Sequence, residues 1–241
     1  MRTLLISDIH ANAAALEAVL RAAGEYERVF CLGDIVGYGP EPQRCIEMVQ
    51  ALPDLTCIMG NHDAALLGLI DLHAFNDEAR RAVEVQQAHV NADGLAWLGS
   101  LPQLAAVGGV NLAHGSPRNP IWEYIMNPAT AQANFGEYEG QICLVGHSHI
   151  ACIFIEEPYL QPSVLLPRQG DRFVNSRRFI LNPGSVGQPR DRNPQASFVI
   201  YDDEEQSWLF QRVKYDITAV QRQIVVLGIP ERHARRLRQG I

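Results

Sequence analysis

Seven side chains that could bind metal ions each follow a short apolar segment of this 241-residue sequence. Buried carboxylates and imidazoles are costly unless they are paired or coordinate a cation, so their recurrence after predicted strands favours a metal site. If one carboxylate bridges two ions, each ion receives about four protein ligands, and a water fits between ions roughly 3.5–4 Å apart. Because no thiolate is among them, these donors suit Mn, Fe or Zn better than Ca or a structural zinc. The seven are Asp8, His10, Asp34, Asn61, His114, His147 and His149.

Short strands followed directly by polar turns are the elements that would position these donors. Apolar runs predict strands over residues 3–7, 28–32 and 55–59, and amphipathic patterns predict helices over 13 to about 23 and 41–52. Successive strand–helix units with right-handed crossovers build a parallel sheet, so the carboxyl ends of all three strands share one edge. Residues two apart in extended backbone point the same way, so we expect Asp8 and His10 to converge.

The rest of the chain predicts more helices and a second sheet. Residues 64–100 have a helical pattern, 104–107 and 110–113 that of a hairpin, and 141–145 that of the strand before His147. Residues 119–140 form either a lid over the site or, as we favour, a packing segment. An amphipathic helix and a short basic helix form a C-terminal extension from about residue 216. We expect residues 1–241 to be one mixed α/β domain, with further strands over 152–155, 164–166, 178–181, 196–201 and 208–213.

Composition and charge limit the classes of partner. With 47% hydrophobic and 20% charged residues, the chain is that of a globular protein with a sizeable core. Its net charge of -7 opposes extended contact with nucleic acid, but a small phosphate-bearing substrate is compatible with it if metal ions supply positive charge. The N-terminus reaches Asp8 too soon for a signal-peptide core, and no apolar run is long enough to span a bilayer. We therefore expect a cytoplasmic protein without membrane contact, and leave a homo-oligomer open.

The five cysteines offer no site of their own. They lack a Cys-x-x-Cys pair and lie inside apolar segments, which is typical of buried, reduced thiols.

Five motifs occur in order along the chain: Asp8-x-His10, Gly33-Asp34, Gly60-Asn61-His62-Asp63, His114 and Gly146-His147-x-His149. Together they resemble the calcineurin-like metallophosphoesterase superfamily, over roughly residues 1 to 200. The resemblance implies a four-layer αββα sandwich of two mixed β-sheets flanked by helices, with a dinuclear metal site.

The resemblance also implies a role for each motif residue. His62 would be the catalytic imidazole, placed to protonate the departing alkoxide after attack by a hydroxide that the two metals activate. Asp63 would either support the metal ligands from behind or simply cap a helix, and we favour the cap. Asp34 would bridge the ions, with Asp8, His10 and His149 completing one site and Asn61, His114 and His147 the other.

Two positions depart from the serine/threonine phosphatase branch of this superfamily. There the Gly-Asp motif continues with a second Asp and an Arg, where this chain has Gly37 and Tyr38. One phosphate-gripping guanidinium is therefore missing, and a phosphomonoester dianion needs such clamps more than a diester monoanion does. The segment from Gly33 to Pro40 is also similar to its counterpart in symmetrical dinucleoside tetraphosphate hydrolases. Tyr38 could then stack on a base or simply anchor its loop.

Arg118 and Arg190 are the candidates for contacts with substrate phosphate. The alternative for each is an ion pair with a nearby acid, for instance Arg190 with Asp191.

Three functions follow from these observations. The leading hypothesis is a metal-dependent hydrolase of phosphodiesters or phosphoanhydrides. The second is a phosphomonoesterase like the serine/threonine protein phosphatases, which Gly37 and Tyr38 disfavour. The third is a non-catalytic scaffold of the same fold, which the presence of His62 and of every ligand position disfavours.

Overall fold

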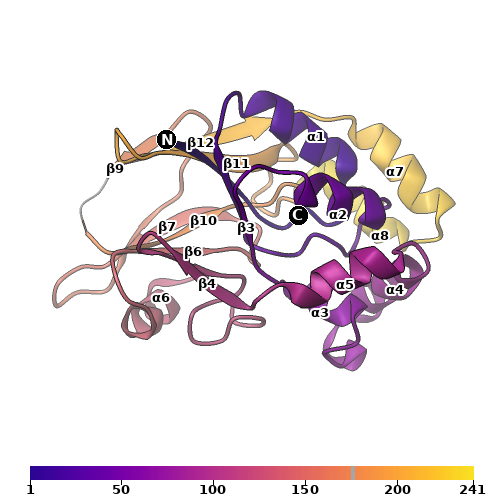
Figure 1. The fold of residues 1–241 in the computed structure, drawn as a ribbon, viewed down its shortest axis with the longest axis horizontal. Coiled ribbons are helices and arrows are strands. Elements are labelled where there is room, and N and C mark those ends of the chain that lie inside the picture. The colour runs from indigo at the N-terminus through magenta and orange to yellow at the C-terminus, as the bar shows by residue number, and fades with distance from the viewer. Residues whose placement is uncertain (175–176) are drawn as a thin grey trace.

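The computed structural model describes residues 1–174 and 177–241. Two mixed six-stranded sheets stack face to face, and helices cover their outer faces (Figure 1). The α/β architecture predicted from the sequence, a four-layer αββα sandwich, is confirmed.

The first sheet contains the three parallel strands that the sequence predicts. β1 pairs in parallel with β2, and β2 with β3, whereas β11 lies antiparallel on the other side of β1. A three-residue edge strand, β9, was not anticipated, because its segment is short and mostly exposed. The order is β3 (Leu55–Cys57), β2 (Arg28–Cys31), β1 (Arg2–Ile6), β11 (Ala196–Asp202), β12 (Ser207–Val213) and β9 (Arg172–Val174).

The second sheet begins with the predicted hairpin, in which β4 and β5 pair over the expected residues. β5, β6 and β10 run parallel, and β7 and β8 continue the sheet antiparallel. The order is β4 (Leu104–Val107), β5 (Val110–Ala113), β6 (Ile142–Val145), β10 (Phe179–Pro183), β7 (Ala151–Ile155) and β8 (Ser163–Leu165).

The helices begin where polar caps precede apolar stripes. At the first helix, the Asn12 side chain accepts a hydrogen bond from the Ala15 N–H, as its sequence position predicts. Among the described residues, no helix is long and apolar enough to cross a membrane. The helices are α1 (Ala13–Ala22), α2 (Pro42–Gln50), α3 (Asn61–Leu66), α4 (Asp77–Gln87), α5 (Ala92–Ser100), α6 (Pro128–Asn134), α7 (Ile217–Val226) and α8 (Glu231–Gln239), with 3-10 turns η1 (Leu72–Ala74) and η2 (Phe135–Glu137).

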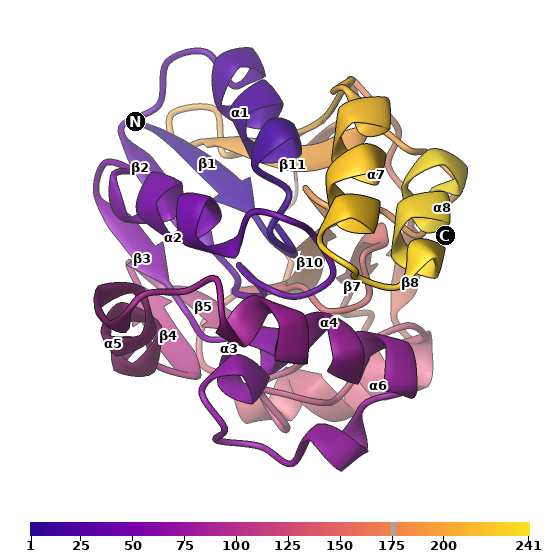
Figure 2. The same cartoon turned by 90° about the vertical axis from the view of Figure 1, so that its right-hand side faces the viewer.

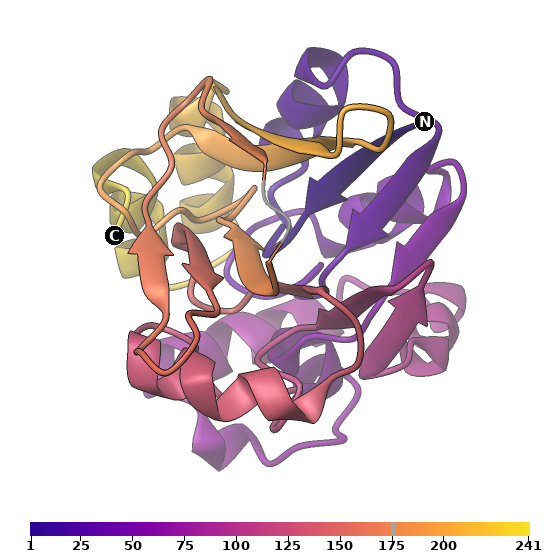
Figure 3. The ribbon, with the colours of Figure 1, turned by 90° about the vertical axis from the view of Figure 1, so that its left-hand side faces the viewer.

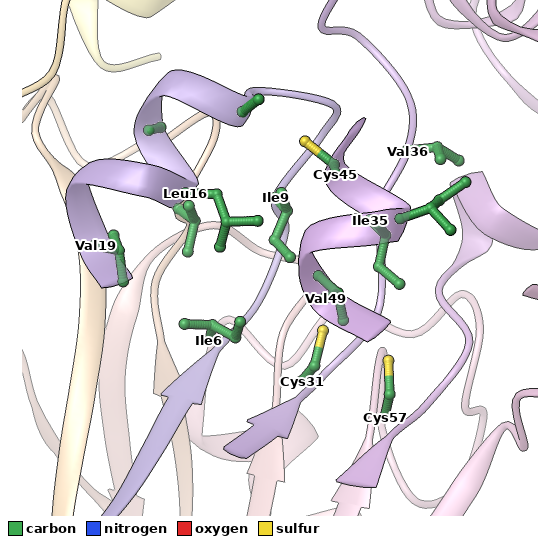
Figure 4. Close-up of a cluster of buried hydrophobic side chains, with 14 of the residues drawn as sticks. Ile6, Ile9, Leu16, Val19, Cys31, Ile35, Val36, Cys45, Val49 and Cys57 are labelled. Atoms are coloured by element: carbon green, nitrogen blue, oxygen red, sulfur yellow. The ribbon is translucent and has the colours of Figure 1, made fainter. Parts of the chain in front are cut away.

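Alternation along the strands divides the core into layers. In β1, Leu5 packs in the cluster between the two sheets, whereas Leu4 and Ile6 pack in the cluster beneath the helices. Figure 4 shows Ile6 on the side of α1 and α2. α6 covers the outer face of the second sheet, which it packs through Ala131. All five cysteines are buried and free, as predicted.

The loops that follow β1, β2, β3, β5 and β6 gather at one edge of the sandwich. Figure 2 shows this edge, with α7 and α8 on one side of it and α4 on the other. Figure 3, from the opposite side, shows the strands of both sheets with α6 in pink below them. The loops that contain the predicted ligands therefore lie together at one edge of the sandwich.

Candidate metal centre and active site

Five of the seven predicted ligands have left-handed backbone. We expected Asp8 and His10 to converge because they alternate in an extended strand, and that reason is wrong. β1 ends at Ile6, and positive φ angles then turn the chain sharply, which brings both side chains to the same point. Such backbone is uncommon outside glycine, although Asp and His tolerate it better than most residues. The five are Asp8 (φ 54°), His10 (50°), Asp34 (53°), His147 (65°) and His149 (60°).

Backbone hydrogen bonds fasten the first two loops together. The Asp8 N–H donates to the Gly33 carbonyl at 3.1 Å, and the His10 N–H to the Asp34 carbonyl at 2.9 Å. The third loop approaches so closely that any Cβ at position 60 would overlap the Asp34 carboxylate, which explains the glycine there. The spacing between these side chains is therefore set by main-chain contacts.

One cluster of potential ligands contains Asp8, His10, Asp34 and His149, all buried. The Nε2 atoms of His10 and His149 are 3.0 Å apart, and His149 Nε2 is 3.3 Å from Asp8 Oδ1. Asp34 Oδ2 lies 3.6 Å from His10 Nε2.

The second cluster contains Asp34, His114 and His147. Its Asp34 Oδ2 is 3.3 Å from His114 Nε2, so this oxygen is common to both clusters. Asn61 joins the second cluster, because its Oδ1 is 3.1 Å from His114 Nε2, and His147 Nδ1 is 3.2 Å from the same nitrogen. The structure thus brings all seven predicted ligands together, with Asp34 in the middle.

The tautomers of the histidines indicate that a cation belongs between them. Nδ1 of His10 donates to the Val36 carbonyl at 3.0 Å, and Nδ1 of His149 to the Gln188 carbonyl at 2.5 Å. Each Nε2 then carries a lone pair, and two lone pairs facing each other at 3.0 Å repel unless a cation lies between them. His114 is oriented in the same way, because its Nδ1 donates to the Leu32 carbonyl and leaves Nε2 as the atom that would bind a metal once its proton is lost. The residues present therefore fit a dinuclear metal site.

Electrostatics in the metal-free site also favour metal binding. Burial lowers the pKa values of His10, His147 and His149 well below the usual range, so these imidazoles are neutral, the form that binds metal. For His114, burial lowers the pKa but the Asp34 carboxylate outweighs it and raises that pKa to about 9. A metal ion at this position would replace the proton that His114 otherwise holds.

Asp63 has both of the roles that we considered, a helix cap and a support for the loop of Asp34. It does cap α3, because its Oδ2 accepts from the Gly60 N–H at 2.9 Å. The same oxygen accepts from the Asp34 N–H at 2.8 Å, and Oδ1 accepts from the N–H groups of Ile35 and Val36 at 3.0 and 3.1 Å. Burial raises the pKa of Asp63 to about 6, and its hydrogen bonds to Gly60 and Val36 oppose that rise. The side chain is thus ionised at pH 7 and ties the second loop to the third.

The imidazole of His62 packs among three aromatic rings. It packs against Tyr38 at 4.3 Å between ring centroids and against His10 and Phe75 at 5.0 Å each. Its buried Nδ1 has no hydrogen-bond partner among the described residues, and a Cβ at Gly37 would overlap that nitrogen. Burial lowers the pKa of His62 to about 4. Gly37 therefore provides the space that the imidazole occupies.

Gln86 fastens the loop that contains Gly37, a role that the sequence analysis missed. Its Oε1 accepts from the Gly37 N–H and its Nε2 donates to the Gly39 carbonyl, both at 2.6 Å. A signal was present in the sequence, because Gln86 follows Val83 by three positions and is a polar residue on the buried stripe of α4.

The side chains of Arg190 and Tyr38 contact each other beside the two clusters of potential metal ligands. Arg190 Nη2 is 3.4 Å from the Tyr38 hydroxyl and 3.2 Å from Gln188 Oε1. The ion pair between Arg190 and Asp191 that we considered is absent among the described residues, because Asp191 pairs with Arg212 instead. Tyr38 is only 8% exposed, which leaves little of its ring open to a base.

Arg118 does form an ion pair, as its alternative interpretation predicted. Its partner Glu123 also accepts hydrogen bonds from the Ser116 hydroxyl at 2.7 Å and from Asn134 Nδ2 at 2.8 Å. Arg118 therefore contributes to the fastening of the loop after His114.

The comparisons with known proteins agree with this site. Residues 1–206 match the calcineurin-like phosphoesterase superfamily domain, and the chain belongs to that superfamily. It is a metallophosphoesterase, a hydrolase acting on phosphate esters.

Three known proteins show how similar this chain is to other members of the superfamily. A metallophosphoesterase crystal structure from Sphaerobacter thermophilus shares 43% identity and a TM-score of 0.93, over 100% of this chain and 99% of that one. An uncharacterized protein of Methanocaldococcus jannaschii is 36% identical over 247 residues, which cover 98% of this chain and 97% of the relative. The symmetrical bis(5'-nucleosyl)-tetraphosphatase of Methylococcus capsulatus is 28% identical over 136 residues, 56% of this chain and 47% of the relative.

Proposed function

We propose that this protein hydrolyses a phosphodiester or a phosphoanhydride. The observation that carries the proposal is the pair of buried clusters that share Asp34, with opposed lone pairs, beside the imidazole of His62. Two metal ions bound there would activate water and neutralise charge on the phosphoryl oxygens. One ion would be held by Asp8, His10, Asp34 and His149, and the other by Asp34, Asn61, His114 and His147.

We assign proton donation to the leaving alkoxide to His62, whose ring burial keeps neutral in the free protein and which a bound phosphate anion would help to protonate. Because its Nδ1 is closed in against Gly37, Nε2 is the atom available to the leaving oxygen. General acid catalysis of this kind contributes about 10²–10⁴-fold when the leaving group is poor.

The charge around the site favours a monoanionic substrate group. Arg190 has no carboxylate within ion-pair distance in the described part of the chain, so we assign its guanidinium to a phosphoryl oxygen. Arg118 is engaged by Glu123 and offers no second clamp. One guanidinium suits a diester or an internal phosphate of an anhydride better than a terminal phosphate dianion.

Aromatic side chains beside the site support a substrate that carries rings. Phe75 contacts both His62 and Trp122, at 5.0 and 5.3 Å between centroids. Tyr124 stacks on His147 at 3.8 Å and 17°, and is 44% exposed. Such faces stack on nucleobases, and the name of the Methylococcus capsulatus relative gives a dinucleotide substrate for that protein.

The decisive experiment compares substrates. The protein is stripped of metal, reconstituted with Mn²⁺, and assayed on bis-p-nitrophenyl phosphate, p-nitrophenyl phosphate and a dinucleoside tetraphosphate. We expect a higher kcat/KM on the diester or the dinucleotide. A preference for the monoester would contradict the proposal and favour the phosphatase hypothesis.

His62→Ala tests the assignment of the acid. We expect both metals to remain bound, with turnover reduced about 10²–10⁴-fold on a poor leaving group and far less on p-nitrophenolate. His89→Ala, at an exposed position in the turn after α4, is the matched control. Equal loss of metal and activity would show that His62 has another role.

Asp34→Asn tests the bridge. Because Asp34 Oδ2 is common to both clusters, we expect the variant to lose tight binding of both ions in equilibrium dialysis. Retention of two tightly bound ions would refute the bridging assignment.

A further inference from the structure

A small cavity lies between the metal-site loops and the two C-terminal helices. Its volume is about 10 Å³, and α7 and α8 contribute Val220, His233 and Leu237 to its walls. Two fully buried atoms in the side chains that line it, Gln188 Nε2 and His233 Nδ1, have no hydrogen-bond partner among the described residues. A buried polar atom without a hydrogen-bond partner lowers the stability of the fold by about 1–3 kcal/mol, so a polar molecule in the cavity would be stabilising.

The hydrogen-bonding character of both atoms is fixed by their neighbours. His233 Nε2 lies 3.2 Å from the Glu78 carbonyl, which only accepts, so Nε2 has the proton and Nδ1 has a lone pair. Burial lowers the pKa of His233 to about 4, which keeps the ring neutral. Gln188 Oε1 faces the guanidinium of Arg190, which only donates, so Nε2 of Gln188 is a donor. Two residues that line the same cavity therefore offer one unpaired donor and one unpaired acceptor.

We propose that one water molecule occupies this cavity, accepting from Gln188 Nε2 and donating to His233 Nδ1, and that this bridge makes His233 a positioning residue for the metal centre. A cavity of about 10–15 Å³ is the size that holds one water, provided that polar partners line it. No larger ligand fits the space.

The bridge acts on the site through Gln188. The backbone carbonyl of Gln188 accepts from His149 Nδ1 at 2.5 Å, and its side chain contacts Arg190. Anchoring Gln188 to α8 thus restrains one proposed ligand and the proposed phosphate contact. The His233 ring adds to this by packing on Tyr38 at 4.6 Å. The roles of His149 and Arg190 rest on the function proposed above, whereas the water does not.

A high-resolution crystal structure of the wild-type protein tests the water directly. We expect density for one water about 2.7–3.2 Å from both Gln188 Nε2 and His233 Nδ1. A dry cavity, or a direct hydrogen bond between the two side chains, would overturn the proposal.

Two substitutions of His233 separate the bridge from simple packing. His233→Phe keeps a ring against Tyr38 but removes the acceptor, whereas His233→Asn keeps an acceptor near the position of Nδ1. Bound Mn²⁺ is measured in competition with a chelator, and KM and kcat on bis-p-nitrophenyl phosphate are measured separately.

We expect His233→Phe to weaken binding of one Mn²⁺ and to raise KM, each by about tenfold, the lower limit for residues that orient metal ligands. His233→Asn should stay within about threefold of wild type, as should the exposed control His89→Phe. Equal weakening in the Phe and Asn variants would show that the ring matters and the bridge does not. Failure of the proposed function would look different, because wild type would bind metal and water yet hydrolyse no diester.

Discussion

Asp63→Asn is the substitution that tests most sharply how the site is built. Asp63 contacts neither proposed metal, yet its two oxygens accept four backbone N–H bonds, two each, from the second and third metal-site loops. The exchange changes one oxygen into an amide and preserves the shape of the side chain. Its effect therefore reports on these four hydrogen bonds and on little else.

The size of the effect follows from which bonds survive. If the amide replaces Oδ2, the bonds from Asp34 and Gly60 are lost, and the new NH₂ group faces two N–H donors. Hydrogen bonds to a charged group contribute about 1.5–3 kcal/mol each, so the loss is about 3–6 kcal/mol. Removing a buried negative charge beside Asp34 offsets part of this. We expect a net destabilisation of about 3 kcal/mol, a large fraction of the stability of a typical domain.

Urea unfolding of the metal-free protein and Mn²⁺ affinity are the two measurements. Because Asp63 sets the backbone position of Asp34, we expect metal binding to weaken by about 10–100-fold as well. Asp71→Asn is the matched control, since Asp71 is exposed and accepts a single N–H bond from His73. If Asp63→Asn unfolds within about 1 kcal/mol of wild type and binds metal normally, the argument is refuted.

Three further predictions concern the surrounding loops. Hydrogen bonds to Glu123 lower its pKa from 4.5 to about 2 despite partial burial, so its contribution is present above about pH 4.5 and is lost as pH falls through 2. After allowance for solvent screening, Glu123→Gln should cost about 1–2 kcal/mol at pH 7, and urea unfolding should show a deficit that shrinks toward pH 2; a constant deficit would contradict this. Gly37→Ala forces a Cβ onto the His62 ring, so assays should show retained metal with turnover reduced at least tenfold, and normal turnover would refute the packing argument. Gln86→Leu leaves the Gly37 N–H and the Gly39 carbonyl unpaired and should lower the unfolding free energy by about 2–4 kcal/mol; a loss below about 1 kcal/mol would show that water replaces both bonds.

Local patterns in the sequence predicted the elements and the chemistry well. The hairpin around Gly108 and Gly109 forms with the predicted residues paired, because alternating apolar residues and two turn glycines suffice to specify it. The family and the architecture followed from ordered motifs, each located after an apolar run. These patterns involve residues close together in the sequence, so they can be recognised without the structure.

Features that depend on distant parts of the chain were not predictable in this way. Asp63 could be read as a cap from its own helix, but its bonds to residues 34–36 exist only once two loops meet. The left-handed turn at Asp8 leaves no periodic pattern. Likewise, Asp191 follows Arg190 in sequence, yet its carboxylate pairs with Arg212 on β12. Adjacent residues are poor guides to partners where the chain turns sharply.

The left-handed backbone at five of the proposed ligands has a consequence for protein engineering. Left-handed backbone costs most residues other than glycine about 1–2 kcal/mol, and Asp and His less, so these five turns together oppose folding by a few kcal/mol. To obtain an inactive but more stable variant of this protein, one would therefore replace these ligands with glycine, which adopts left-handed backbone without steric strain. The residues proposed to bind metal are thus also residues whose backbone conformation opposes folding.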